Sequence, residues 1–180
     1  QAAAVSIDNN SGYVVAIVGG RKQDSDNYTL NRAYQSYRQP GSSIKPLLVY
    51  TPQLERGYTP DTVVDDHKLK DGPSNANNTY AGKIPLRYAV AHSINTIAWQ
   101  LYDELTPKTG LQYLKNMKFA QIKDGDYTLA TSLGGFTKGV SPLEMASGYA
   151  AVENDGLYRE PTCVKSIVDS DENVVYTSSL

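Results

Sequence analysis

Cysteine and histidine are scarce in this sequence of 180 residues, which contains one cysteine and two histidines. A single thiol excludes an intramolecular disulfide, and so few Cys and His side chains argue against a Cys/His metal site. We expect no metal and no cofactor. Cys163 lies in the apolar run CVKSIV and is predicted to be a small buried side chain. Its isolation does not decide the compartment, because many extracytoplasmic bacterial proteins also lack disulfides.

The sequence also has no apolar run of the roughly 18–20 residues that spans a bilayer, and no signal peptide is recognisable. No run of Lys or Arg stands out and the net charge is −2. This balance argues against nucleic acid or an anionic membrane surface as the main partner. The chain starts without a leader at QAAAVSID, so we expect it to be a piece of a longer protein.

The order of the predicted elements indicates an α+β fold. Two segments, 3–19 and 163–178, each read as apolar strands around a turn and predict β-hairpins. Between them, helices are expected at 42–57, 84–93, 95–105, 106–117 and 141–154, with loops over 20–39 and 58–82. Hairpin, helices and hairpin together predict antiparallel strand pairs with a largely helical middle, in one domain.

Local signals set several helix ends. Pro46 falls in the first turn of the 42–57 helix, where a missing N–H costs little, whereas Pro52 is expected to distort that helix. Thr106 is predicted to cap the next-to-last helix. Ser141 and Glu144 form the pattern of a capping box at the start of the last one.

The segment PGSSIKP contains a Ser42-x-x-Lys45 spacing that places both side chains on one face of a helix. A hydroxyl beside an amine is a way to build a nucleophile without histidine. Ser42 lies at a helix start, which favours a developing negative charge. Lys45 lies among apolar neighbours, which lowers the pKa of a lysine and favours a neutral amine. The alternative is a capping serine followed by a solvated lysine.

Serine–lysine acyl transfer uses two further motifs, a Ser-x-Asn and a Lys-Thr-Gly on a strand. Two obvious matches fail on context. Ser25-Asp26-Asn27 precedes the nucleophile instead of following it, and Lys108-Thr109-Gly110 falls in the first turn of a predicted helix. Neither match is therefore accepted as a motif of the site.

Ser93-Ile94-Asn95 is the better second motif, because it follows Ser42 and lies at a break between two predicted helices. Ser93 Oγ could relay a proton, and Asn95 could hold the lysine and the substrate amide. The alternative for Ser93 is a plain helix N-cap. His92 invites a Ser-His interpretation, but adjacent residues rarely face one another on a helix and no acid is evidently placed to orient its ring. His92 and His67 are expected to be ordinary surface or packing residues.

Four segments of the sequence resemble those of a known protein family: AVSIDNNSGYVVAIVGG, LNRAYQSYRQPGSSIKP, LRYAVAHSINTIA and GVSPLEMASGYA. In this order they resemble the transpeptidase domain of class A (bifunctional) penicillin-binding proteins, over most of the chain. The resemblance implies the penicillin-binding/serine β-lactamase-like fold, an antiparallel sheet with a helical subdomain. It also implies that Ser42 is the acylated nucleophile, Lys45 its general base, and Ser93 and Asn95 the second motif.

The implied reaction is D,D-transpeptidation, in which peptidoglycan stem peptides ending in D-Ala-D-Ala are cross-linked through a serine acyl-enzyme. The implied partners are that donor peptide, an amine acceptor and β-lactams, which acylate the same serine. The implied location is the extracytoplasmic face of the cell membrane, with an anchor and a glycosyltransferase domain upstream. Alternatives with this fold are a β-lactamase, a β-lactam sensor and a catalytically incomplete cell-wall-binding module.

One departure from the family is large, because the chain ends at VVYTSSL with no Lys-Thr-Gly in a strand context. We expect residues 1–180 to be the N-terminal portion of a single transpeptidase domain that lacks its C-terminal strands. A companion fragment that carries the third motif is the favoured explanation, and a true truncation with unpaired sheet edges is the alternative. The β-lactamase alternative needs a Glu that activates a deacylating water, and none is in a matching setting: Glu104 ends a predicted helix and Glu144 belongs to the capping box. A slowly deacylating transferase therefore fits better.

Overall fold

A computed structural model describes residues 2–21 and 29–178 of the chain. Contacts divide the chain into two compact units, Gln1–Tyr37 with Val140–Leu180 and Arg38–Gly139. The first, here called the hairpin unit, holds the strands predicted at both ends of the sequence. The second, the helical unit, holds the predicted catalytic residues. The mixture of helices with short antiparallel sheets confirms the predicted α+β class.

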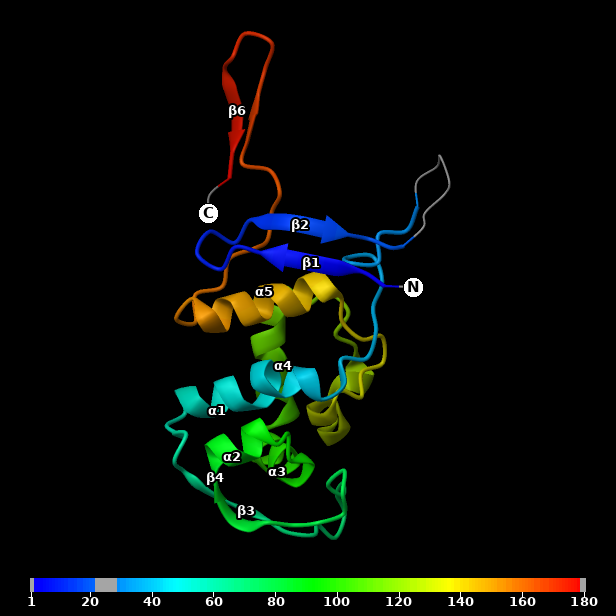
Figure 1. Ribbon diagram of the computed structural model, residues 1–180, viewed down its shortest axis with the longest axis vertical. Coiled ribbons are helices and arrows are strands. Elements are labelled where there is room, and N and C mark those ends of the chain that lie inside the picture. The colour runs from blue at the N-terminus through cyan, green and yellow to red at the C-terminus, as the bar shows by residue number, and fades with distance from the viewer. Residues whose placement is uncertain (1, 22–28, 179–180) are drawn as a thin grey trace. The chain divides into compact units, whose positions relative to one another are not determined.

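In the hairpin unit, β1 (Ala4–Ile7) pairs antiparallel with β2 (Val14–Val18), as predicted, with a register shift between Ser6 and Ile7. Helix α5 (Pro142–Glu153) packs along β1 (Figure 1). Its predicted capping box is present, since Ser141 N donates to Glu144 Oε2 at 2.8 Å and Glu144 N donates to Ser141 Oγ at 3.2 Å. The helix therefore starts where the sequence signal predicts.

The second predicted hairpin forms from β5 (Ser166–Val168) and β6 (Val174–Thr177). Every residue of these two strands is exposed, including Val174 and Val175. The prediction that Cys163 is buried is wrong, because its thiol is exposed just before this hairpin. Its apolar neighbours in the sequence belong to an uncovered ribbon and supply no core around it.

The helical unit begins with a continuous helical stretch made of η1 (Gly41–Ile44), η2 (Pro46–Tyr50) and α1 (Thr51–Glu55). Segment η2 is a π-helix, in which Thr51 N donates to Pro46 O. The distortion expected at Pro52 takes this form: the proline offers no N–H to Leu48 O, and the wider turn before it accommodates the ring. The stretch ends at Glu55, close to the predicted position.

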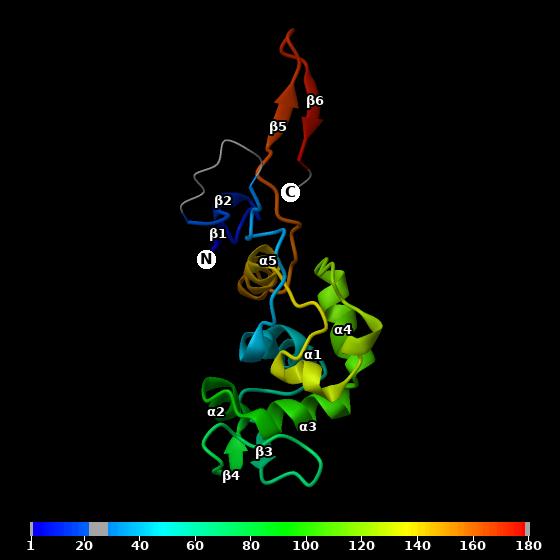
Figure 2. The same ribbon diagram turned by 90° about the vertical axis from the view of Figure 1, so that its right-hand side faces the viewer.

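Two further helices pack on this stretch, α3 (Asn95–Leu105) and α4 (Pro107–Asn116) (Figure 2). Gly110 of α4 makes the close approach possible, because a Cβ there would lie 2.9 Å from Leu48 O and 2.4 Å from the Tyr102 ring. The short turns η3 (Asp124–Asp126) and η4 (Leu129–Leu133) follow, and η4 contacts α3. The core of the unit consists of buried side chains from these elements: Ile44, Leu47, Leu48, Val49, Ile97, Ala98, Leu101, Tyr102, Leu105, Leu111 and Leu114.

The predicted loop over 58–82 is partly wrong. Residues Val63–Asp66 form β3, which pairs antiparallel with β4 (Gly82–Pro85), and α2 (Leu86–Ala91) starts only after β4. Ile84 and Pro85, predicted to be helical, are therefore in a strand. The sequence VVDD has no apolar–polar alternation, and the alternating burial of β3 appears only in the structure, where the strand packs against α3. Segment 29–39 contains no helix or strand, as predicted.

Candidate active site

The two adjacent serines of PGSSIKP have different surroundings. Ser43 Oγ donates to Pro40 O at 2.6 Å and so closes the turn that starts the helix. Ser42 is exposed within η1, and no hydrogen-bond partner for its hydroxyl lies within residues 2–21 and 29–178. Of the two hydroxyls, the one at Ser42 is thus the one left to react.

The turn before Ser42 is held by a close backbone contact. Gly134 has φ +90°, and a Cβ there would lie 2.3 Å from both Cα and N of Gly41. Such separations are far inside van der Waals contact, so only glycine fits at position 134. Gln39 Nε2 adds a hydrogen bond to Phe136 O at 3.2 Å. Segment 134–136 therefore braces the residues that present Ser42.

Lys45 is buried, with 1% of its surface exposed. The alternative of a solvated lysine is wrong. Its Nζ donates three hydrogen bonds, to Ser93 O at 2.8 Å, to Ser93 Oγ at 3.1 Å and to Asn95 Oδ1 at 2.8 Å. No carboxylate among the described residues forms an ion pair with it. Burial without a counter-charge lowers the pKa of Lys45 to about 8.

Ser93 lies in the turn between α2 and α3, and Asn95 is the first residue of α3, as the position of the segment between two predicted helices indicated. Ser93 has φ +51°, an uncommon conformation for a residue with a side chain. This backbone geometry turns both its carbonyl and its hydroxyl towards Lys45. The N-cap of α3 is Ile94, so the alternative role of Ser93 as a plain N-cap is wrong.

Asn95 has a defined amide orientation. Its Nδ2 donates to Ser74 O at 3.1 Å, which leaves Oδ1 to accept from Lys45. Ser93 O and Asn95 Oδ1 are acceptors only, whereas the Ser93 hydroxyl can donate or accept. A neutral Lys45 amine has two N–H groups and one lone pair. If the two fixed acceptors take the N–H groups, the lone pair is left for a hydroxyl.

A cavity of about 280 Å³ borders this turn, with Tyr88, His92 and Ser93 on one side and residues of the 75–81 loop on the other. His92 stacks on Tyr88 with ring centroids 3.8 Å apart, and its Nδ1 lies 3.0 Å from Tyr88 O. His67 Nδ1 lies 3.1 Å from Asp65 O in an exposed position. His92 thus packs locally and His67 is a surface residue, as expected.

The rejected motif matches are also explained by the structure where it describes them. Lys108, Thr109 and Gly110 lie in the first turn of α4, capped by Thr106 Oγ1, which accepts from Thr109 N at 3.4 Å. Gly110 serves packing against Leu48, as shown above. Ser25-Asp26-Asn27 lies outside the described residues.

The acids considered for a β-lactamase have other contacts. Glu104 accepts from Tyr58 OH at 2.7 Å and lies nine residues after Asn95 on α3, about 14 Å along the helix axis. Glu144 is part of the capping box of α5. Neither glutamate is placed by these contacts to activate a deacylating water.

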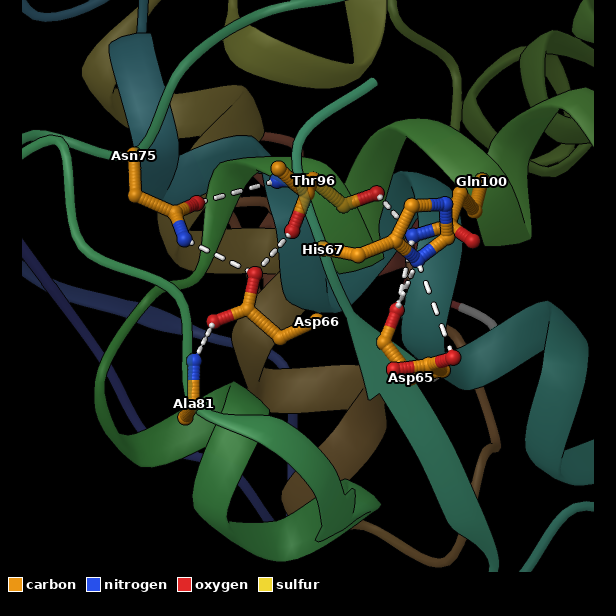
Figure 3. A network of polar contacts seen from close by, with 7 residues as sticks. All are labelled: Asp65, Asp66, His67, Asn75, Ala81, Thr96 and Gln100. Atoms are coloured by element: carbon orange, nitrogen blue, oxygen red, sulfur yellow. Dashed lines mark hydrogen bonds and ion pairs between the residues drawn. The ribbon is translucent and has the colours of Figure 1, made fainter.

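A polar network around Asp66 (Figure 3), which contacts Asn95 through Asn75, was not predicted from the sequence. Its centre is Asp66 on β3, which is 2% exposed. Asp66 Oδ1 accepts from Thr96 Oγ1 at 2.5 Å and from Asn75 Nδ2 at 2.8 Å, and Oδ2 accepts from Ala81 N at 2.8 Å. Burial opposes ionisation, but these hydrogen bonds outweigh it, so the pKa of Asp66 lies below its ordinary value. Asp66 lies in the polar sequence DDH at the end of β3, so the residues beside it did not signal that it is buried.

The family model described as the penicillin binding protein transpeptidase domain matches residues 2–179. The chain belongs to this family. Penicillin-binding protein 4 of Bacillus subtilis is 38% identical over 180 residues, which cover 98% of this chain and 28% of that protein. Penicillin-binding protein 1A of Aquifex aeolicus is 37% identical over 180 residues, covering 95% of this chain and 24% of that protein.

Solved structures agree with this assignment. Penicillin-binding protein 1A from Haemophilus influenzae superposes with a TM-score of 0.79 at 32% identity, over 98% of this chain and 27% of that one. PonA1 from Mycobacterium tuberculosis, solved in complex with penicillin V, gives a TM-score of 0.81 at 25% identity, over 98% of this chain and 50% of that one. These matches confirm the resemblance and the fold expected from the sequence.

The chain spans about a quarter of the length of the curated relatives described above. In the ranges that the structure describes, no helix is long and apolar enough to cross a membrane. Over those same ranges, His, Cys, Asp and Glu side chains do not gather in groups of three or more that could hold a metal ion.

Proposed function

We propose that this chain carries the serine–lysine half of a D,D-transpeptidase site that cross-links peptidoglycan stem peptides. The observation that supports the proposal most directly is the buried Lys45 amine, held by Ser93 and Asn95 one helical turn after an uncommitted Ser42 hydroxyl. Membership of the transpeptidase family supports the reaction type, serine acyl transfer.

In the proposed reaction, Ser42 Oγ attacks the carbonyl carbon of the penultimate D-alanine while its proton passes to the Lys45 amine. The peptide C–N bond then breaks, and D-alanine leaves with a proton relayed through Ser93 Oγ. An amine from a neighbouring peptidoglycan strand attacks the acyl-enzyme, forms the new amide and returns a proton to Ser42. Asn95 holds Lys45 and the substrate amide. A neutral, buried amine suits the first step because it can accept the proton at ordinary pH.

We further propose that both units belong to one transpeptidase domain, which the match over residues 2–179 supports. A Lys-Thr-Gly strand from chain outside this sequence, whether on the same polypeptide or a companion fragment, completes the site. The proposed location is the extracytoplasmic face of the cell membrane, where the donor peptide and the acceptor amine occur. The proposed site is also the target of β-lactams, in line with the penicillin V complex of the similar PonA1.

The test is acylation of the natively expressed protein that contains this sequence. The protein is incubated with penicillin V, and the adduct is measured by intact mass and located by peptide mapping. We expect one adduct, on Ser42. Ser42→Ala should abolish the adduct. Ser43→Ala is the matched control and should keep the adduct, since the Ser43 hydroxyl donates a hydrogen bond to Pro40 O. An adduct on Ser43, or none in the wild type, would contradict the proposal.

A further inference from the structure

Helix α3 begins without a cap of its own. Its N-cap residue is Ile94, whose side chain makes no capping hydrogen bond. The first N–H groups of the helix are instead satisfied by a residue from the β3–β4 loop: Asn75 Oδ1 accepts from Asn95 N at 3.1 Å and from Thr96 N at 3.2 Å. Asn75 thus does from 20 residues away what an N-cap side chain normally does locally.

The orientation of the Asn75 amide is fixed by acceptors on its other side. Its Nδ2 donates to Asp66 Oδ1 at 2.8 Å and to Thr79 O at 2.9 Å. An amide flipped by half a turn would set its oxygen against both of these oxygens, so Oδ1 must face α3. Asn75 is 7% exposed and Asp66 2% exposed, so water does not compete freely for these bonds.

The same network reaches Lys45 through Asn95, the first residue of α3. Asn75 holds the backbone N–H of Asn95, and the neighbouring Ser74 O holds its Nδ2. The remaining polar atom, Asn95 Oδ1, accepts from Lys45 Nζ at 2.8 Å. Residues 74 and 75 therefore fix both the position of Asn95 and the direction in which its oxygen points.

We propose that Asn75, clamped by Asp66, is a positioning residue that aligns Asn95 against the Lys45 amine during acylation of Ser42. This inference rests on the proposed function. Asn75 acts through Asn95 and needs no contact with the substrate. Its loss should slow the step in which the Ser42 proton is transferred by a larger factor than it weakens non-covalent binding of a β-lactam, since Asn95 also holds the substrate amide in the proposed reaction.

The experiment measures penicillin V acylation of the natively expressed protein at increasing drug concentration, for the wild type and Asn75→Ala. Three quantities are separated: the limiting first-order rate constant, the half-saturating concentration and the final adduct stoichiometry. For Asn75→Ala we expect a limiting rate about tenfold lower, from the weakened hydrogen bond to a charged group, with a smaller change in half-saturation and an unchanged stoichiometry. Asn116→Ala is the matched control. Asn116 is exposed at the end of α4, where its Oδ1 accepts from Gln112 Nε2 at 2.9 Å, and its loss should change none of the three.

A purely structural role for Asn75 would lower the adduct stoichiometry with the unfolded fraction and leave the limiting rate of the folded protein intact, and this result would overturn the inference. If Asn75→Ala does not fold, Asp66→Asn preserves the shape of the network while loosening its hold on Asn75. It should lower the limiting rate by a smaller factor, and an unchanged rate there would equally overturn the inference. A wild type that penicillin V does not acylate overturns the proposed function itself, so the two failures are distinguishable.

Discussion

The two units of this chain differ in how far they bury their side chains. In the helical unit, Leu47, Ile97 and Leu111 are fully covered, and the buried polar groups Asp66, Asn75 and Lys45 all have partners. In the hairpin unit, Val15, Val174 and Val175 are each more than 60% exposed. The proposed serine–lysine pair therefore lies on a well-buried core, whereas the strands of the other unit bury little surface of their own.

The largest effect is expected when the buried Lys45 is compared with the exposed Lys108. Lys45→Ala should lower the rate of penicillin acylation by roughly a thousandfold, because it removes the proposed general base. Lys108→Ala is the matched control, since Lys108 has the motif-like sequence but is exposed on α4. Acylation kinetics of both variants check the prediction. A large loss in Lys108→Ala alone would reverse the assignment of the two lysines.

The second prediction concerns the brace before Ser42. Gly134→Ala should destabilise the protein by about 3 kcal/mol, since the new Cβ meets the Gly41 backbone and the residue keeps a positive φ. Gly156→Ala in the hairpin unit has a similar φ of +82° but nothing within 4 Å of the new Cβ. It should cost only about 1–2 kcal/mol of backbone strain. Denaturant unfolding of both variants measures the difference, and equal costs would mean that the contact at Gly41 is not a tight one.

The third prediction is a pH dependence. Lys45 acts as a base only when neutral, and its pKa is lowered to about 8, so the acylation rate should rise with pH through that value. At pH 7 the rate should be about a tenth of its plateau, because about one amine in ten is neutral. The second-order rate constant for penicillin V, measured from mildly acidic to alkaline pH, gives the midpoint. A midpoint near the ordinary lysine value of about 10.4 would show that Lys45 is not desolvated.

The smallest effect is expected on the exposed ribbon. Val175→Ala on β6 should change the free energy of unfolding by about 0.5 kcal/mol or less, as for most surface positions. Val49→Ala, the same substitution at a fully buried position of the helical unit, should cost about 2 kcal/mol. A large cost at Val175 in the natively expressed protein would mean that another segment covers this hairpin there.

Much of the fold was predictable because its signals are local. The hairpin at 3–19, the capping box at Ser141 and Glu144, and the break at Ser93 each depend on a few adjacent residues, and each is present. The sequence predicted a distortion at Pro52 but not its π-helical form, and the strand β3 was not predicted because it depends on packing against α3. The burial of Cys163 was predicted wrongly, because apolar neighbours in the sequence do not guarantee that a residue is surrounded by a core in the structure.

The candidate site divides in the same way. The Ser42 and Lys45 spacing is visible in one helical turn, and the structure brings Lys45 together with Ser93 and Asn95, about 50 residues downstream. The support from Asp66 and Asn75 was missed, because it joins a strand, a loop and a helix through contacts 9 to 30 residues apart. No spacing rule in a single sequence reports such a network.

One of the three oxygens around Lys45 is the main-chain carbonyl of Ser93, placed there by that residue's left-handed conformation. A side-chain substitution at this position removes the hydroxyl but cannot delete the carbonyl. Part of the lysine's environment is therefore supplied by the path of the backbone at position 93 and not by a side-chain group. Amino-acid changes selected at this turn can tune proton transfer while the lysine stays tethered.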